Sequence, residues 1–116
     1  MHIERIVTRP DPYEAFRLAQ GYRVGDLLFI SGQAAYDDAG RVVGAGDFAV
    51  QAERAMANLD RALRAGGSSL KNIVKVTIFL TKPENIVPYR EVRDRLMGDA
   101  RPASTLVVVS QLVRPE

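Results

Sequence analysis

The stretch that decides the fold is QAERAMANLDRALRAGGSSLKNIVKVTIFLT (51–81), because it places a helical pattern directly before a strand pattern. Apolar residues recur at spacings of three and four, which predicts an amphipathic helix over 48–65. Asp47 is the expected N-cap, since its carboxylate can accept hydrogen bonds from the first free amides. The pair Gly66-Gly67 is the expected left-handed stop. The stretch therefore predicts a helix packed on a strand.

The strand half of this stretch, IVKVTIFLT (73–81), alternates in polarity. Successive side chains of a strand point to opposite faces of the sheet. One face is expected to carry Val74, Val76, Ile78 and Leu80, and the other Lys75, Thr77, Phe79 and Thr81.

The remaining elements are predicted on either side of this unit. Pro88 in the first turn and Asn85 as a candidate cap favour a second helix over 86–97, which Gly98 ends. Further strands are expected over 3–7, 17–24, 27–34 and 104–112. Strands followed by helix, strand, helix and strand predict an α+β fold, a mixed sheet with both helices on one face.

Two apolar stretches, LLFI (27–30) and LVVV (106–109), carry apolar side chains to both faces of their strands. Two helices can cover only one face of the sheet, so something else must bury the other. The simplest candidate is another copy of the chain, and we expect an oligomer.

Composition narrows the class of protein. The 116 residues suit a single domain over 1–116, and 47% of them are hydrophobic. Cysteine is absent, and no apolar run approaches the roughly 18 residues of a membrane span. We therefore expect a cytoplasmic protein that does not enter the membrane. Basic and acidic residues are interspersed along the helix, which is typical of a solvated face and argues against a nucleic-acid partner.

Three patterns suggest chemistry that other features disfavour. GAGDFA (44–49) has the form of a dinucleotide fingerprint, but Asp47 would stand where a pyrophosphate binds. Asp37 and Asp38 are adjacent acids in a turn, where they usually stabilise the turn itself. The only histidine is His2, which argues against a catalytic triad and against a ribonuclease. No cluster has metal-ligand spacing, so neither a metal nor a cofactor is expected.

Two strand ends are more promising. ISGQ (30–33) offers the hydroxyl of Ser31, the open backbone of Gly32 and the amide of Gln33. RPAST (101–105) offers hydroxyls where a strand begins. The alternative for both is structural, a bend at a strand end and a loop entering a strand.

These stretches together resemble the RidA/YjgF family, the reactive-intermediate deaminases, whose older members were labelled endoribonuclease L-PSP. VGDLLFISGQ (24–33) resembles its V-G-D/N-L-V/L-F-x-S-G-Q, and 51–81 resembles its helix followed by A-G-S-S-L and a K-x-T-V-F-L strand. RPASTLVVVSQL (101–112) resembles P-A-R-S/T-x-V-x-V-x-x-L. The resemblance covers about residues 17–112.

The resemblance implies a chorismate-mutase-like fold and a homotrimer with a barrel-like core. Ligand clefts would lie between subunits. Active members hydrolyse enamines and imines, such as 2-aminoacrylate, to a 2-keto acid and ammonia without a cofactor. An arginine of the P-A-R motif binds the substrate carboxylate, which suits guanidinium geometry.

This chain departs from the family pattern at several positions. Ser104 stands at the motif arginine and Thr105 at the hydroxyl after it, while Leu18 stands at a tyrosine of the cleft. The family continues into another strand that carries a glutamate, so the last strand is expected to be missing or truncated here. Two residues that could replace the lost charge are Arg101 and Arg90. The sequence thus predicts a divergent deaminase or, alternatively, a non-catalytic trimer that binds a metabolite, for which a carboxylate is a candidate.

Overall fold

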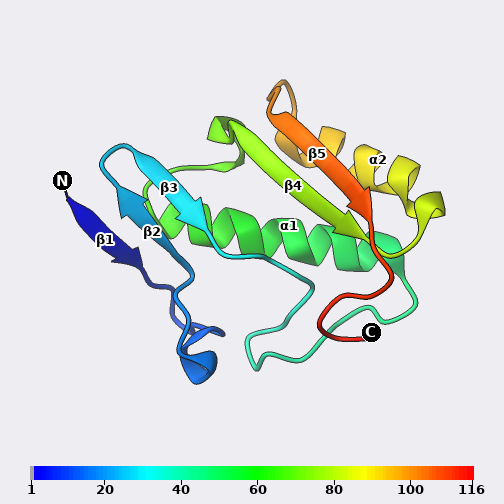
Figure 1. The fold of residues 1–116 in the computed structure, drawn as a ribbon, viewed down its shortest axis with the longest axis horizontal. Coiled ribbons are helices and arrows are strands. Elements are labelled where there is room, and N and C mark those ends of the chain that lie inside the picture. Colours follow the sequence, from blue (N-terminus) through cyan, green and yellow to red (C-terminus); the bar gives the residue numbers. More distant parts are fainter. Residues whose placement is uncertain (1) are drawn as a thin grey trace.

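The computed structural model describes residues 2–116 and contains two helices and five strands (Figure 1). The strands are β1 (Ile3–Ile6), β2 (Gly21–Val24), β3 (Leu27–Ile30), β4 (Lys75–Leu80) and β5 (Ala103–Val108). The helices are α1 (Phe48–Ala65) and α2 (Ile86–Met97), and three short 3₁₀ turns are η1 (Glu14–Phe16), η2 (Leu70–Asn72) and η3 (Pro83–Asn85).

The strands pair in two ways, as the predicted mixed topology requires. β1, β2 and β3 form an antiparallel sheet in that order, whereas β4 and β5 form a parallel pair. Figure 1 shows both helices behind the strands, on the same side of them. The α+β class with two helices on one face is therefore confirmed. The antiparallel and parallel pairings are divided between two sheets.

The main buried cluster lies between the two helices. Met56 of α1 packs with Val92 and Met97 of α2, and η2 and the end of the α2–β5 loop complete this cluster. Burial of such side chains is the main favourable term in folding. Neither helix within residues 2–116 has the length and apolarity that a membrane crossing requires.

Both helices occupy the ranges that the sequence predicts. Asp47 caps α1, since its carboxylate oxygen accepts from the amide of Val50 at 3.2 Å. Gly67 has φ +87°, the left-handed conformation expected after the helix. The predicted side-chain cap of α2 is wrong, because Asn85 makes no capping hydrogen bond and instead ends the turn η3.

The predicted strand bounds were too long for all five strands, and three of them account for the largest errors. Residues 17–20 are not a strand, because Arg17 has φ +56° and turns the chain after η1. β3 ends at Ile30 instead of residue 34, and β5 ends at Val108 instead of residue 112. In the first two cases, polar contacts described below hold the backbone away from a sheet.

The sheet faces follow the predicted alternation. In β4 exposed and covered residues alternate along the strand, and Leu28 of β3 points to α1, where it approaches Gly66. We call the faces of the two sheets that point away from the helices the outer face. Its members in the last three strands are Leu27, Phe29, Lys75, Thr77, Phe79, Ala103, Thr105 and Val107.

Candidate functional site

The segment Ser31–Gln33 follows β3, and the chain itself uses its polar groups. The hydroxyl of Ser31 donates to the carbonyl oxygen of Ala19 at 2.6 Å, and its amide donates to the carbonyl oxygen of Gln20 at 2.8 Å. The side-chain amide nitrogen of Gln33 donates to the carbonyl oxygen of Ser31 at 3.0 Å and to the side-chain oxygen of Gln20 at 3.3 Å. These contacts favour the structural interpretation of Ser31 and Gln33, since both hold residues 19–20 beside the end of β3.

Gly32 differs from its two neighbours because its surroundings are open. It is exposed, and a Cβ added there would meet no atom within 4 Å. The hydroxyl of Tyr13 donates to the carbonyl oxygen of Gly32, a contact that the sequence did not suggest. Burial raises the pKa of Tyr13, and the nearby Tyr36 and Asp11 raise it further, so Tyr13 stays neutral and remains a donor.

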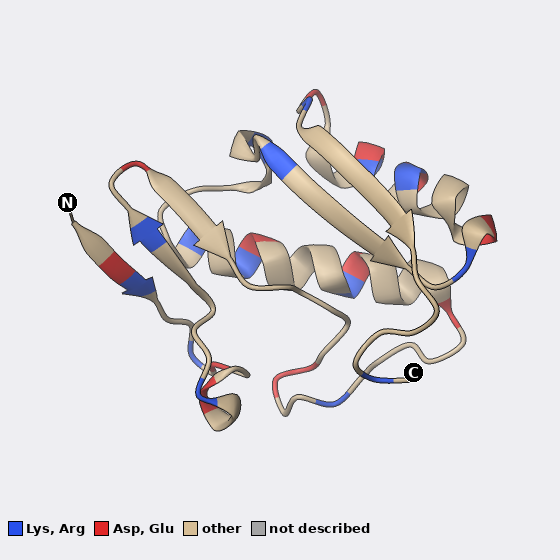
Figure 2. Ribbon diagram, viewed as in Figure 1, with Lys and Arg blue, Asp and Glu red and all other residues tan. Residues whose placement is uncertain are grey.

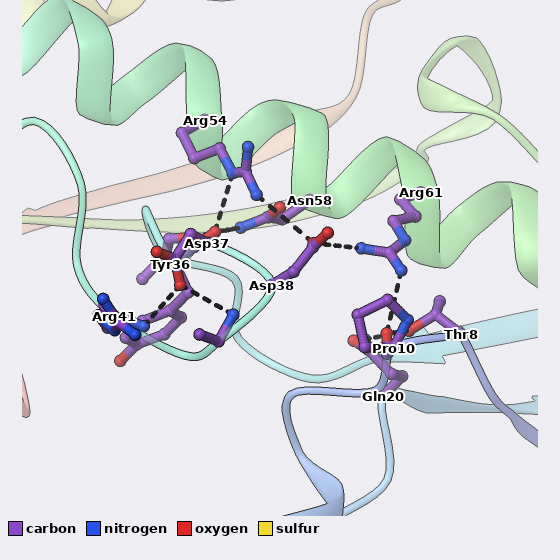
Figure 3. A network of polar contacts seen from close by, with 12 residues as sticks. Thr8, Pro10, Gln20, Tyr36, Asp37, Asp38, Arg41, Arg54, Asn58 and Arg61 are labelled. Atoms are coloured by element: carbon purple, nitrogen blue, oxygen red, sulfur yellow. Dashed lines mark hydrogen bonds and ion pairs between the residues drawn. The ribbon is translucent and has the colours of Figure 1, made fainter.

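A polar stripe on α1 holds the loop that follows Gln33 (Figure 3). Asn58 donates to the carbonyl oxygens of Ala34 at 2.8 Å and Tyr36 at 2.9 Å. Arg54 donates to the same Tyr36 oxygen at 2.8 Å, and Gln51 donates to the carbonyl oxygen of Val43 at 3.3 Å. The stripe thus satisfies backbone groups of a loop that has almost no strand pairing of its own.

Arg61 extends this stripe to the N-terminal segment. It donates to Asp38 at 3.0 Å and to the carbonyl oxygen of Pro10 at 3.0 Å, and Figure 3 shows it between these two partners. The prediction that the charges of α1 form only a solvated face is therefore wrong for this side of the helix. The sequence does place the polar residues 51, 54, 58 and 61 on one side of the helix. A stripe that only faces solvent has the same spacing, so the spacing alone does not indicate contacts with a loop.

Asp37 and Asp38 have the structural role that the sequence favours. One carboxylate oxygen of Asp37 accepts from the amides of Ala39 and Arg41, each at 2.9 Å. The backbone amide of Arg41 is the main cause that lowers the pKa of Asp37, and the amide of Ala39 adds to it. Likewise, GAGDFA is the capped start of α1, where Gly44 has φ +69° and a Cβ would lie 2.7 Å from Val50.

Ser104 and Thr105 lie on β5 but point to opposite faces of it. Ser104 pairs in register with Val76 on the side of the helices, whereas Thr105 pairs with Thr77 on the outer face. The hydroxyl of Thr105 accepts from the ammonium of Lys75 at 3.3 Å. Only Thr105 of the two therefore shares the outer face with the exposed side chain of Phe79.

The other three predicted site residues stand apart within one chain. Leu18 is 53% exposed in the turn after η1. Arg90 is exposed on α2, in the helical layer. Arg101 donates to the carbonyl oxygens of Asp99 and Ala100, both at 3.1 Å, and so turns back on its own loop.

The structure thus forms two groups of predicted residues and does not join them. Leu18 and Ser31–Gln33 lie in loops next to the antiparallel sheet, whereas Ser104 and Thr105 lie on β5 and Arg101 in the loop before it. Arg90 lies on α2, outside both groups. Within residues 2–116 no hydrogen bond connects the two groups. The sequence prediction did not single out Lys75, which is the only charged residue of β4 and β5.

The comparisons with known proteins agree with this architecture. The chain is 33% identical over 110 residues to a RutC family protein of Pyrococcus abyssi, covering 94% of this chain and 86% of that protein. The structure is similar to that of yeast Mmf1, with a TM-score of 0.88, 28% identity and coverage of 97% and 89%. It is also similar to YyfA of Yersinia pestis, of the conserved Rid protein family, with a TM-score of 0.90, 26% identity and coverage of 97% and 90%.

Sequence and fold lead to the same assignment. Residues 8–116 match the sequence profile described as Endoribonuclease L-PSP. This range contains the Ser31–Gln33 segment, both helices and the β4–β5 pair. The chain therefore belongs to the endoribonuclease L-PSP family, which is the RidA/YjgF family.

Proposed function

We propose that this chain forms a homotrimer whose clefts between copies bind a small carboxylate metabolite and hydrolyse an enamine or imine. The observation that carries the proposal is the uncovered outer face. Phe29 is 59% exposed and Phe79 is 53% exposed there, although both lie within strands. Large apolar patches on a single chain usually mark an interface.

The division of the predicted site into two groups supports a cleft between copies. Gly32 and Leu18 are exposed in loops next to the antiparallel sheet, and Thr105 is exposed on β5 of the parallel pair. If the outer faces of neighbouring copies pack together, one copy's Gly32 region can meet another copy's Thr105 region. The open surroundings of Gly32 would then leave room for the ligand.

The proposed reaction needs a bound water and no cofactor. In 2-aminoacrylate, the enamine first takes up a proton at carbon to become an imine. Water adds to the imine carbon, the C–N bond breaks, and ammonia leaves together with a 2-keto acid. An interior between copies would strengthen polar contacts with the ligand because it excludes solvent.

The direct test measures release of ammonia and pyruvate from 2-aminoacrylate generated during the assay. Spontaneous hydrolysis without protein sets the baseline, and size-exclusion chromatography with light scattering confirms the assembly. We expect the purified chain to accelerate the release in proportion to its concentration. A rate equal to the baseline, in a folded assembly, would contradict the deaminase.

A second candidate, a non-catalytic trimer that binds the metabolite unchanged, is favoured by Ser104. Serine cannot supply the charge of the motif arginine, whose contact with a carboxylate is worth roughly 10- to 150-fold in affinity. A thermal-shift screen separates the candidates, because a binder returns its ligand chemically intact. The single domain over 1–116 and the cytoplasmic location remain predictions from the sequence.

A further inference from the structure

The proposed function requires a cation for the ligand carboxylate, and Ser104 does not provide one. We infer that Lys75 binds this carboxylate, together with the hydroxyls of Thr77 and Thr105. The inference rests on the proposed function, since it identifies how the same site recognises its ligand class.

Lys75 has a distinctive position in the sheet. It is the only charged residue of β4 and β5, and Figure 2 shows one blue band at the start of β4 and none on β5. In the parallel register Lys75 pairs with Ala103, and Thr77 pairs with Thr105. All four side chains therefore point to the outer face.

The ammonium of Lys75 contacts neutral oxygens only. It donates to the carbonyl oxygen of Val76 at 2.8 Å and to the hydroxyls of Thr77 and Thr105 at 3.3 Å each. None of the ion pairs formed within residues 2–116 includes Lys75. Its charge is therefore not neutralised by the chain itself.

This arrangement is complementary to an anion. A threonine hydroxyl that accepts a hydrogen bond from an ammonium still has its own proton to donate. The two hydroxyl protons can therefore donate to one carboxylate, and the ammonium can join them by exchanging one of its three present acceptors for a carboxylate oxygen. Beyond the polar end, Phe79 and Val107 extend the same face as an apolar surface for the rest of a small organic acid.

Assembly strengthens the requirement for an anion. In the proposed trimer the outer face is buried, and burying an ammonium without a counter-charge is very unfavourable. Neither β4 nor β5 contains an acidic residue that could serve as counter-charge. A ligand carboxylate would supply it.

The other candidate cations are less well placed to bind a carboxylate beside Thr105. Arg101 binds carbonyl oxygens of its own loop, and Arg90 lies on α2 in the helical layer. Arg5 shares the outer face on β1, but it already pairs with Glu14 at 2.8 Å and Asp11 at 3.7 Å. Lys75 is the cation that lies beside Thr105.

The test compares pyruvate with its uncharged amide, pyruvamide, by isothermal titration calorimetry. Wild type should bind pyruvate more tightly than pyruvamide. Lys75→Met should weaken pyruvate binding roughly 10- to 150-fold and leave pyruvamide unchanged. Lys75→Arg should retain most of the preference for pyruvate, because it keeps the charge. The matched control is Lys82→Met, which removes an exposed lysine just beyond β4 and should bind as wild type does.

A measurement on wild type covers the case in which Lys75→Met fails to fold. The chain has three lysines, 71, 75 and 82, so lysine-selective labelling gives three side-chain NMR signals. Pyruvate should shift the signal of Lys75 alone. Pyruvate binding that is unchanged in Lys75→Met, a wild type without preference for pyruvate, or a Lys75 signal that does not move would overturn the inference.

The outcomes also separate this inference from the proposed function. If wild type hydrolyses 2-aminoacrylate and Lys75→Met is equally fast and binds pyruvate equally well, the inference fails and the deaminase stands. If Lys75 binds pyruvate but wild type does not accelerate hydrolysis, the inference stands and the deaminase fails.

Discussion

Two polar regions of this chain differ in whether their cations meet an opposite charge within it, since Arg54 and Arg61 pair with Asp38 and Lys75 has no such partner among the described residues. The segment from Ser31 to Val43 directs its carbonyl and side-chain groups to the chain itself, chiefly to Asn58, Arg54 and Arg61 of α1. On the outer face of β4 and β5, Lys75 contacts only neutral oxygens. The first region is a structural network. The second holds a charge that no ion pair of the described residues compensates and two threonine hydroxyls whose protons can still donate, and it is where we propose that the ligand carboxylate binds.

The largest effect is expected from a change that tests whether the outer face is an interface. Phe79→Asp would place a carboxylate in the proposed interface, where an unpaired buried charge costs several kcal/mol per copy. Light scattering should show that the assembly dissociates to single chains of 12.8 kDa. The control Val113→Asp changes a residue that is 93% exposed outside the strands and should keep the wild-type mass. A Phe79→Asp protein with the wild-type mass would contradict the interface.

A smaller effect is expected in the structural network. Asn58→Ala removes the donor to the carbonyl oxygens of Ala34 and Tyr36, which should lower the free energy of unfolding by about 1–3 kcal/mol. Arg64→Ala removes a surface ion pair with Asp60 one turn away and should cost about 0.5 kcal/mol or less. Urea denaturation measures both. Equal losses for the two variants would show that Asn58 does not hold the loop.

The smallest effect concerns the turn at Asp37. Its pKa is lowered in the folded state, so its charge stabilises the fold above the unfolded pKa, and this contribution is lost as pH falls through the folded pKa. Asp37→Asn keeps an acceptor but removes the charge. Thermal unfolding should show a slightly lower melting temperature than wild type at about pH 7, and the difference should shrink and vanish as the pH falls through the lowered pKa of Asp37 in the folded state. A difference in melting temperature between the two proteins that grows as the pH falls would contradict a stabilising charge at Asp37.

The sequence predicted the regular part of the fold because that information is local. The ranges of α1 and α2 follow from apolar spacing, from Asp47 and from the glycines after each helix. The alternation in β4 also predicted which of its residues share a face of the sheet. Residues 17–20 were assigned wrongly because Arg17 turns the chain and Ser31 then holds Ala19, a partner twelve residues away.

The candidate site was only partly predictable because its contacts join residues that are far apart in the sequence. Ser31 and Gln33 were recognised as residues with useful chemistry, but their contacts with Ala19 and Gln20 depend on tertiary structure. Thr105 was recognised by its motif, while Lys75, which lies in the K-x-T-V-F-L stretch, was not singled out as a site residue. Its link to Thr105 spans 30 residues and becomes visible only in the register of β4 and β5.

The most direct measurement of the central claim is a crystal structure of the full chain with pyruvate. Our account predicts that the outer faces of neighbouring copies bury Phe79, and that the pyruvate carboxylate lies within hydrogen-bond distance of the Lys75 ammonium and the Thr105 hydroxyl. A structure in which the outer face remains exposed to solvent, or in which pyruvate binds away from Lys75, would contradict it.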